Sequence, residues 1–271
     1  MLKSFAGGRL FGGTWGSGVP TVLALHGWRR THDDFSGVFG THDPSEAVSA
    51  VGLDLFGFGA TPAPPEAWGT DEYARQLLPL FEESGVLAER VVVVGHSFGG
   101  RVAVRLGALV PERIERMVLT GVPLLDRQGR RARPAFAFRM GRRLNAMGLL
   151  GDERMEEMRS RYGSSDYRAA QGVMRDVLVR LLSERYVESM SAIRCPVDLV
   201  WGAQDTDVPV EVAVRARSLF PSAELATLPG VGHLVPTEAP LELRRFVLGR
   251  DTRGSTPPPA VVDDDPTTGP R

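Results

Sequence analysis

Apolar residues recur along this chain in short unbroken runs, each about as long as a β-strand. The runs are RLFGGTW (9–15), TVLAL (21–25), AVSAVGL (47–53), RVVVV (90–94), IERMVLT (114–120), VDLVW (197–201) and AELATL (223–228). Several are apolar throughout rather than alternating, which is typical of strands that helices cover on both faces. The first run is predicted to be an edge strand of the same sheet.

Segments with helical periodicity separate these runs. Between residues 71 and 84 apolar side chains fall on one face, with Thr70 as the expected N-cap, Gly85 as the stop and Pro79 as the expected position of a kink. Further helices are predicted after Ser97 up to Pro111, and at 208–220 and 238–248. The alternation of strand and helix predicts an α/β fold with a doubly wound, mostly parallel sheet flanked by helices.

Residues 122–191 interrupt this alternation, because no strand signal occurs there and the composition turns rich in Arg, Met and Leu. Helical spacing is clearest in GVMRDVLVRLLSERYVESM (172–190). We therefore predict a helical cap at 122–191, inserted into a core formed by 1–121 and 192–249, since an unstructured loop of that length would be unusual. The tail at 250–271 is rich in Pro, Thr and Asp and is expected to be disordered.

Charge and composition exclude several kinds of partner. The 271 residues carry a formal net charge of −1, which argues against nucleic acid or an acidic membrane surface as the main partner. The basic run RQGRRAR (127–133) contains no stacking aromatics and is interpreted as a solvated segment. Neither a signal-peptide core nor an apolar run long enough to span a bilayer occurs. We expect a cytoplasmic protein, monomeric or homodimeric, that binds neither nucleic acid nor membrane.

A single cysteine, Cys195, excludes an internal disulfide and offers no cysteine cluster for a metal. It lies between an isoleucine-arginine pair and an apolar run, and we expect it to be a small buried hydrophobic residue rather than a reactive thiol. No metal site is predicted.

The pentapeptide GHSFG presents a candidate nucleophile, Ser97, directly after the predicted strand 90–94 and before a predicted helix. A sharp turn from strand to helix strains the backbone of the residue at the corner and exposes its side chain. Gly95 and Gly99 keep the neighbouring backbone from colliding. Since a serine hydroxyl is a poor nucleophile on its own, this motif requires a base.

Five histidines are candidates for that base. His96 adjoins the serine but its side chain should point away, His26 belongs to a turn after an earlier strand, and His32 and His42 lie in a polar loop. His233 follows the last predicted strand and falls at the carboxyl edge of the sheet, where doubly wound folds bind their ligands. We predict His233 to be the base.

An acid that orients the histidine is expected at the end of another strand. Asp205 and Asp207 both follow VDLVW, and Asp205 is preferred because Asp207 lies close enough to the next helix to be its N-cap. Asp126 is a second possible acid, several residues beyond its strand. The order Ser, Asp, His along the chain agrees with Asp205.

Two backbone amides are candidates to bind an oxyanion. One is the N–H of Phe98, which follows the nucleophile and begins a helix. The other is the N–H of Trp28 in HGW, where Gly27 permits a close approach of the backbone and His26 is expected to stiffen the turn by hydrogen bonding.

Together these motifs resemble the α/β-hydrolase fold superfamily, in its capped serine hydrolase branch, from about Leu10 to Leu248. The motifs that carry the resemblance are HGW, DLFGFGAT, GHSFGG, WGAQDTDVP and GVGHLVPTEAP. The branch includes carboxylesterases, cofactor-free haloperoxidases, epoxide hydrolases, haloalkane dehalogenases and carbon–carbon bond hydrolases. One departure is Phe56, which stands where the family usually has Pro, so the loop beside the pocket is expected to differ in shape.

The resemblance implies Ser97 as nucleophile, His233 as base, Asp205 as acid and the Trp28 and Phe98 amides as oxyanion donors, with no cofactor or metal. Serine at the elbow disfavours epoxide hydrolase and dehalogenase chemistry, for which relatives use Asp. We expect a serine hydrolase that acts on a small carboxylic ester or related acyl compound. Three alternatives stay open: a carbon–carbon bond hydrolase, a lyase or perhydrolase, and a non-catalytic receptor for a small ligand.

Overall fold

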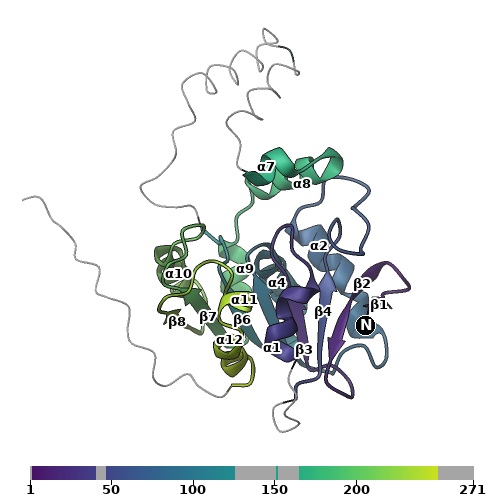
Figure 1. The fold of residues 1–271 in the computed structure, drawn as a ribbon, viewed down its shortest axis with the longest axis horizontal. Coiled ribbons are helices and arrows are strands. Elements are labelled where there is room, and N and C mark those ends of the chain that lie inside the picture. Colours follow the sequence, from purple (N-terminus) through teal and green to yellow (C-terminus); the bar gives the residue numbers. More distant parts are fainter. Residues whose placement is uncertain (1, 41–46, 126–150, 152–164, 250–271) are drawn as a thin grey trace, which may run out of the picture.

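Eight strands form one sheet in the computed structural model, which describes residues 2–40, 47–125, 151 and 165–249. The strands are β1 (Leu2–Phe5), β2 (Leu10–Trp15), β3 (Val22–Leu25), β4 (Ala50–Asp54), β5 (Val91–His96), β6 (Ile114–Thr120), β7 (Val197–Gly202) and β8 (Ala223–Leu228). Their order across the sheet is β1-β2-β4-β3-β5-β6-β7-β8. Only the pairs β1–β2 and β2–β4 are antiparallel, so the predicted mostly parallel sheet is confirmed (Figure 1).

Helices cover both faces of the sheet. Successive residues of its central strands face opposite ways, and because these residues are apolar, both faces need to be buried. Leu23 and Leu25 of β3 pack in the apolar cluster of one face, and Val22 and Ala24 pack in that of the other. The first cluster includes residues of α2 (Thr70–Leu77), α3 (Pro79–Glu82), α4 (Phe98–Leu109), α8 (Gly172–Leu181), α9 (Val187–Ala192) and α10 (Val210–Arg217). The second includes residues of η1 (His32–Phe35), α1 (Ser36–Phe39), α11 (Val235–Glu238) and α12 (Pro240–Val247). The predicted doubly wound arrangement is thereby confirmed.

The helix expected at 71–84 is shorter and broken. It divides at Pro79 into α2 and α3, because proline cannot donate the backbone hydrogen bond that would continue the first helix. The expectation that Thr70 is the N-cap is wrong: the N-cap is Gly69, whose N–H donates to Glu72 at 2.9 Å. The hydroxyl of Thr70 instead donates to Glu184 at 2.6 Å, far along the chain.

Three helices are described between β6 and β7: α7 (Ser165–Ala169), α8 and α9. The helical pattern expected to run through 172–190 is interrupted between α8 and α9, where the ring of the buried Tyr186 packs against the guanidinium groups of Arg101 and Arg105 of α4. In Figure 1, α7 and α8 stand beyond the layers of the sheet, whereas α9 lies against α4. The division into core and cap stays a prediction.

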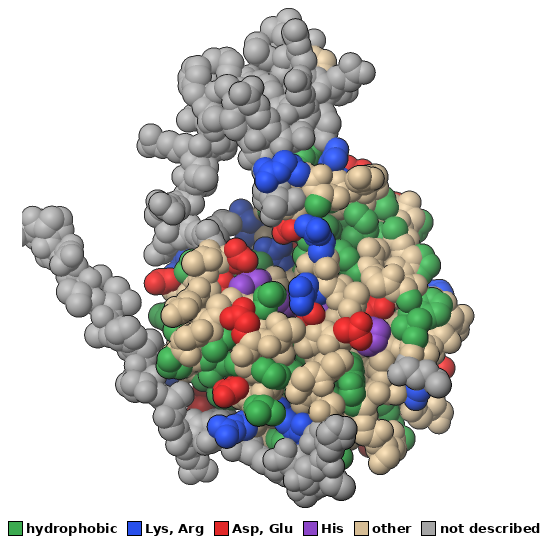
Figure 2. All heavy atoms as spheres, viewed as in Figure 1, with side chains coloured by type: hydrophobic (Ala, Val, Ile, Leu, Met, Phe, Trp, Pro, Cys, Tyr) green, Lys and Arg blue, Asp and Glu red, His purple; other side chains and the backbone are tan. Residues whose placement is uncertain are grey.

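Several predictions fall outside the described residues: the tail at 250–271, the basic run at 127–133 and the candidate acid Asp126. Within the described ranges, each helix is too short or too polar to cross a bilayer. On the face shown in Figure 2, acidic and basic side chains are interspersed, in keeping with the balanced charge of the sequence.

Candidate active site

Ser97 forms the corner between β5 and α4 with a backbone conformation that L-residues rarely adopt. Its φ is 48° and its ψ is −111°, a strained combination that persists only where the surroundings fix it. Its N–H donates to the Thr120 carbonyl of β6 at 2.9 Å, and its own carbonyl accepts from Gly100 and Arg101 of α4. Hydrogen bonds on both sides therefore hold the strained residue in place.

Gly95 and Gly99 stand where the chain has no space for a side chain. A Cβ at Gly99 would lie 2.2 Å from the Leu25 carbonyl oxygen, and a Cβ at Gly95 would lie 2.5 Å from the Gly100 Cα. The Gly99 N–H also donates to the His26 carbonyl at 2.9 Å. The first turn of α4 is therefore fixed directly against the end of β3, where the HGW loop begins.

His26 stiffens that loop as a neutral imidazole. Its Nδ1–H donates to the Gly27 carbonyl at 2.7 Å and its Nε2 accepts from the Leu55 N–H at 3.0 Å. Burial lowers its pKa from 6.5 to about 4, since a charged imidazole would lose its hydration. One side chain thus joins the loops that follow β3 and β4.

The amides of Trp28 and Phe98 both belong to this corner. Trp28 packs its ring edge-on against Phe98, with ring centres 5.5 Å apart. Among the hydrogen bonds of the described residues, neither amide has an acceptor. Unpaired backbone donors of this kind are available to an anionic or carbonyl oxygen.

Asp205 and His233 form a hydrogen-bonded pair at the same edge of the sheet, beyond β7 and β8. His233 Nδ1–H donates to Asp205 Oδ2 at 2.8 Å, and the side chain of Asp205 is wholly buried. Asp205 Oδ1 accepts the N–H groups of Asp207 at 2.9 Å and Val208 at 2.7 Å. The carboxylate is fixed at both oxygens, and the pair leaves His233 Nε2 free to accept a proton. Asp207 contributes its amide to this pair; the N-cap of α10 is Pro209.

The loop that carries His233 is held by two residues for which the sequence predicted no such role. His96, dismissed as a base, donates from Nε2 to the His233 carbonyl at 3.1 Å, and the two rings lie 5.0 Å apart. Glu238 accepts the N–H groups of Gly232 at 2.6 Å and Leu234 at 3.0 Å, one on each side of His233. The sequence does carry a signal for the Glu238 contacts: Glu238 follows His233 by five residues, and the short helix α11 between them, which contains Pro236, brings its carboxylate back to the loop.

The three predicted catalytic residues lie at the same sheet edge, but only two of them are hydrogen-bonded to each other directly. Asp205 and His233 are hydrogen-bonded, while Ser97 is linked to His233 through the neighbouring His96. Within the described residues the Ser97 hydroxyl makes no hydrogen bond to His233. Such contacts often tighten only when substrate binds.

A second histidine–carboxylate pair fixes the loop after β4. Asp54 accepts from the N–H and the Nδ1–H of His32 at 2.9 and 2.8 Å, and from the Ala60 N–H at 2.9 Å. Burial alone would raise the pKa of Asp54, but these hydrogen bonds lower it below its usual value. The pair shapes the loop that holds Phe58 over Trp28, with ring centres 4.9 Å apart.

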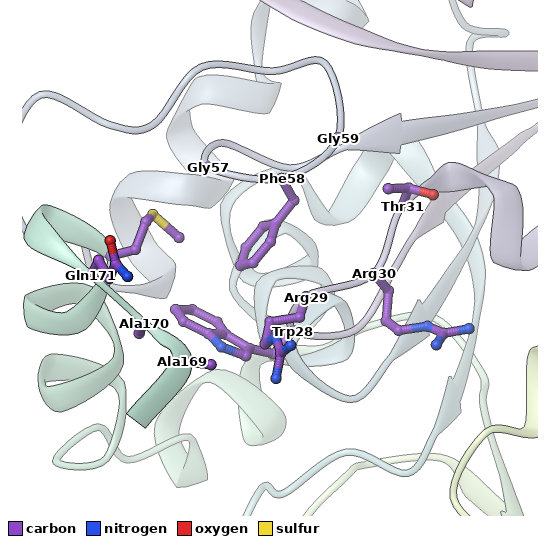
Figure 3. Close-up of a pocket in the computed structure, with 11 residues that line it drawn as sticks. Trp28, Arg29, Arg30, Thr31, Gly57, Phe58, Gly59, Ala169, Ala170 and Gln171 are labelled. Carbon is purple, nitrogen blue, oxygen red and sulfur yellow. The ribbon is translucent and has the colours of Figure 1, made fainter. Parts of the chain in front are cut away.

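A cavity of about 370 Å³ opens beside these two aromatic rings (Figure 3). Three segments line it: the HGW loop from Trp28 to Thr31, the loop from Gly57 to Gly59, and the α7–α8 turn from Ala169 to Gln171 with Met174. The cavity therefore adjoins the candidate oxyanion loop and lies between it and α7–α8.

Within the described part of the chain, no three His, Cys, Asp or Glu side chains are grouped so as to hold a metal ion. Cys195 is buried, as predicted, and burial raises the pKa of its thiol to about 11. A thiol with that pKa is protonated at neutral pH and is a poor nucleophile.

Comparison with known proteins gives a consistent result. The model of the alpha/beta hydrolase family matches residues 22–246. The uncharacterized hydrolase YugF of Bacillus subtilis is 25% identical over 246 residues, which cover 82% of this chain and 86% of YugF. A thermophilic esterase from Thermogutta terrifontis superposes with a TM-score of 0.63 at 19% identity, covering 90% of this chain and 94% of the esterase. The meta-cleavage product hydrolase of Pseudomonas fluorescens IP01 gives 0.63 at 18% identity, with 89% and 94% covered. The two structures share the fold.

We predict that Gly99→Ala destabilises the protein by about 1–3 kcal/mol, because the new methyl group would meet the Leu25 and His26 carbonyl oxygens within 2.5 Å. Urea unfolding measures the change. Gly151→Ala is the matched control, since no atom of the described residues lies within 4 Å of a Cβ there, and its stability should change by less than about 0.5 kcal/mol. Equal stability of the two variants would contradict this account of the corner.

We also predict that the protein loses stability as the pH falls below about 6.5. Burial lowers the pKa of His26 to about 4 and that of His96 to about 3. Between those values and 6.5 the unfolded chain binds protons that the folded protein does not. Stability is therefore fully present above the unfolded pKa and declines by up to about 1.4 kcal/mol per pH unit for each histidine. Urea unfolding from pH 7 to pH 5 tests this. In His96→Asn the free energy of unfolding should fall less steeply with pH, by up to about 1.4 kcal/mol per pH unit, because the unfolded chain has one fewer histidine to protonate. A flat profile would show that these imidazoles are not buried as described.

Proposed function

This chain belongs to the alpha/beta hydrolase family, and on that premise we propose that it is a serine hydrolase that cleaves a small carboxylic ester or a related acyl compound. The observation that carries the proposal is the 2.8 Å hydrogen bond between His233 Nδ1 and the buried Asp205 carboxylate. It lies at the same sheet edge as Ser97, whose backbone is strained in the manner of a nucleophile elbow.

In the first half of the reaction, His233 Nε2 takes the proton of Ser97 while the serine oxygen bonds to the carbonyl carbon of the substrate. Asp205 fixes the imidazole in the tautomer that leaves Nε2 unprotonated, and it stabilises the imidazolium once the proton has moved. The bond between carbon and leaving group then breaks, and the leaving alcohol receives the proton from His233. An acyl group remains on Ser97.

In the second half, water replaces the alcohol. His233 Nε2 accepts a proton from water as the water oxygen bonds to the acyl carbon, and it returns that proton to the departing Ser97 oxygen. The Trp28 and Phe98 amides are assigned to the negative oxygen that forms in both halves, and their lack of internal acceptors supports that assignment. The Phe98 amide has the further advantage of the helix N-terminus.

The insertion between β6 and β7 is assigned to substrate binding. α7, α8 and the turn between them contribute Ala169, Ala170, Gln171 and Met174 to the cavity beside the oxyanion loop, which supports a cap at 122–191 over a core of 1–121 and 192–249. A cavity of this size suits a small molecule.

We predict that Ser97→Ala abolishes ester turnover and covalent labelling by a fluorophosphonate probe, because both require the serine oxygen as nucleophile. Intact-mass analysis of the labelled protein and a panel of chromogenic esters provide the measurements, and circular dichroism checks that the variant is folded. Activity of Ser97→Ala close to that of wild type would refute the assignment. Labelling without turnover of any ester would direct attention to carbon–carbon bond substrates.

We predict that Asp205→Asn lowers kcat by about 10⁴-fold, because an amide in this position no longer selects the imidazole tautomer that leaves Nε2 as a base. Asp207→Asn is the control: it keeps the backbone N–H that donates to Asp205, so its kcat should fall by less than about tenfold. If Asp126→Asn caused the large loss instead, Asp205 would be the wrong acid.

A further inference from the structure

The cavity beside the oxyanion loop has an uneven lining. Its apolar part includes the rings of Trp28 and Phe58 and the side chain of Met174, and its polar part includes Arg29, Arg30 and Gln171 (Figure 3). Arginine in a ligand cavity is suited to carboxylates and phosphates, since its planar N–H groups match their oxygens. The two arginines differ in how strongly an aspartate already binds them.

Arg30 is already occupied. Its Nε donates to Asp34 Oδ2 at 2.7 Å and its Nη2 donates to Asp34 Oδ1 at 2.6 Å. This two-point pairing satisfies the carboxylate-binding side of the guanidinium group and balances its charge. In Figure 3 the Arg30 side chain extends away from the Trp28 ring.

Arg29 is engaged far more weakly. Among the described residues its acidic partner is Asp166 of α7, with 3.7 Å between Nη1 and Oδ1, and both side chains are about half exposed. This distance exceeds that of a hydrogen bond, and an exposed pair of this kind contributes little stability. Within the described residues the Arg29 guanidinium donates no hydrogen bond, so its N–H groups remain available at the cavity.

The backbone of Arg29 has a left-handed conformation, with a φ of 59°. A residue with a Cβ adopts it at a cost that glycine would avoid. The turn is closed by the Arg30 N–H, which donates to the Gly27 carbonyl at 3.2 Å. The loop therefore holds the Arg29 side chain at the cavity in spite of local strain.

The neighbouring Trp28 carries an unpaired donor as well, but a buried one. Its indole Nε1–H has no hydrogen-bond partner in the described chain. Because that atom is shielded from the cavity, it offers no donor to a ligand there. Of the two consecutive residues, Arg29 is the one whose exposed side chain supplies available N–H groups to the cavity that both residues line.

From these contacts we infer that Arg29 binds a carboxylate of the substrate, and that the substrate is an acyl compound that carries this carboxylate in addition to its reacting acyl group. The inference rests on the proposed hydrolase function and names its substrate class. The substrate carboxylate replaces Asp166 as the partner of Arg29, forming charge-assisted hydrogen bonds that Asp166 does not form.

The test compares two pairs of esters that differ in one carboxylate. 4-Nitrophenyl hydrogen adipate is compared with 4-nitrophenyl hexanoate, which places the carboxylate on the acyl side, and carboxymethyl butyrate is compared with ethyl butyrate, which places it on the leaving side. The readout is the ratio of kcat/KM within each pair. We expect wild type to prefer the charged ester of one pair and Arg29→Gln to reduce that ratio by about tenfold. The pair that responds identifies the side on which the carboxylate lies.

Arg75→Gln is a matched control. Arg75 and Arg29 have equal side-chain exposure, 56%, and each is paired with a half-exposed aspartate, but Arg75 lies on α2 outside the cavity lining. Both substitutions remove one positive charge from the protein. The ratio should change by less than about twofold in Arg75→Gln. A ratio that falls equally in both variants would overturn the assignment of Arg29.

Asp166→Asn tests whether Arg29 binds the substrate carboxylate or only holds α7 to the loop through its pair with Asp166. If Arg29 binds the substrate carboxylate, removing the competing Asp166 carboxylate raises the preference for the charged ester, opposite to the effect of Arg29→Gln. If the Arg29–Asp166 pair only holds α7 to the loop, the two variants change the ratio in the same direction, and the inference fails.

Direct binding keeps this inference apart from the hydrolase proposal. Calorimetric titration with adipamate and with hexanamide requires no turnover; both ligands carry an amide in place of the ester, and only adipamate carries a carboxylate. We expect wild type to bind adipamate about tenfold more tightly than hexanamide and Arg29→Gln to lose the difference. Arg29-dependent adipamate binding without turnover of any ester would leave the anion site standing and reject the hydrolase proposal. Ester turnover without a preference for the carboxylate-bearing compound in either assay would support the hydrolase proposal and reject the anion site at Arg29.

Discussion

The close approach of α4 to the end of β3 is the constraint on which the rest of the site depends. The Gly99 N–H reaches the His26 carbonyl at 2.9 Å, and the space between them admits no side chain. This contact places the residue after the nucleophile beside the HGW loop, which itself is fastened to the β4 loop through His26. Two loops and one helix end are therefore held in one register by a backbone hydrogen bond from Gly99 and a hydrogen bond to the His26 side chain, and this register accompanies the strained conformation of Ser97.

The opposite side of the site depends on a different kind of support. His233 lies on a loop, and its position is set from three directions: by the Asp205 carboxylate, by the His96 ring and by Glu238 across the turn. Of these, His96 is fully buried and belongs to the same corner as Ser97. Because its low pKa keeps it neutral, it contributes a hydrogen bond without adding positive charge next to the imidazole that is proposed to become charged during the reaction.

Much of this arrangement could be predicted from the sequence because its signals are local. The buried strands are apolar runs, and the elbow is a pentapeptide with its strand and helix on either side. β1 was not predicted, since three of its four residues are exposed and it carries no apolar pattern. Because β1 forms the edge of the sheet, the expectation that the run at 9–15 is an edge strand is wrong. Thr70 was misjudged because its hydroxyl binds Glu184, 114 positions later. Propensity rules describe a residue's neighbours along the chain, and they cannot anticipate a partner that only the folded protein supplies.

In the candidate site, too, some features follow from local sequence signals and others depend on partners that only the fold supplies. The pairing of Asp205 with His233 could be expected from strand ends and chain order, whereas the difference between Arg29 and Arg30 could not. The two are consecutive and chemically identical, and only the fold places one beside Asp34 and leaves the other at a cavity. The role of Glu238 likewise depends on the turn that brings its carboxylate back to the amides around His233.

The adjacency of Trp28 and Arg29 has a consequence for how this protein could be altered. One residue supplies a backbone donor proposed for the reacting carbonyl and the next supplies the side chain proposed for the remote end of the molecule, so only a single peptide plane separates the two tasks. Because Arg29 has a left-handed φ of 59°, a β-branched replacement there would strain the loop that carries the Trp28 amide. Redesign of selectivity at position 29 should therefore use residues that tolerate this conformation, so that the proposed oxyanion donor keeps its position.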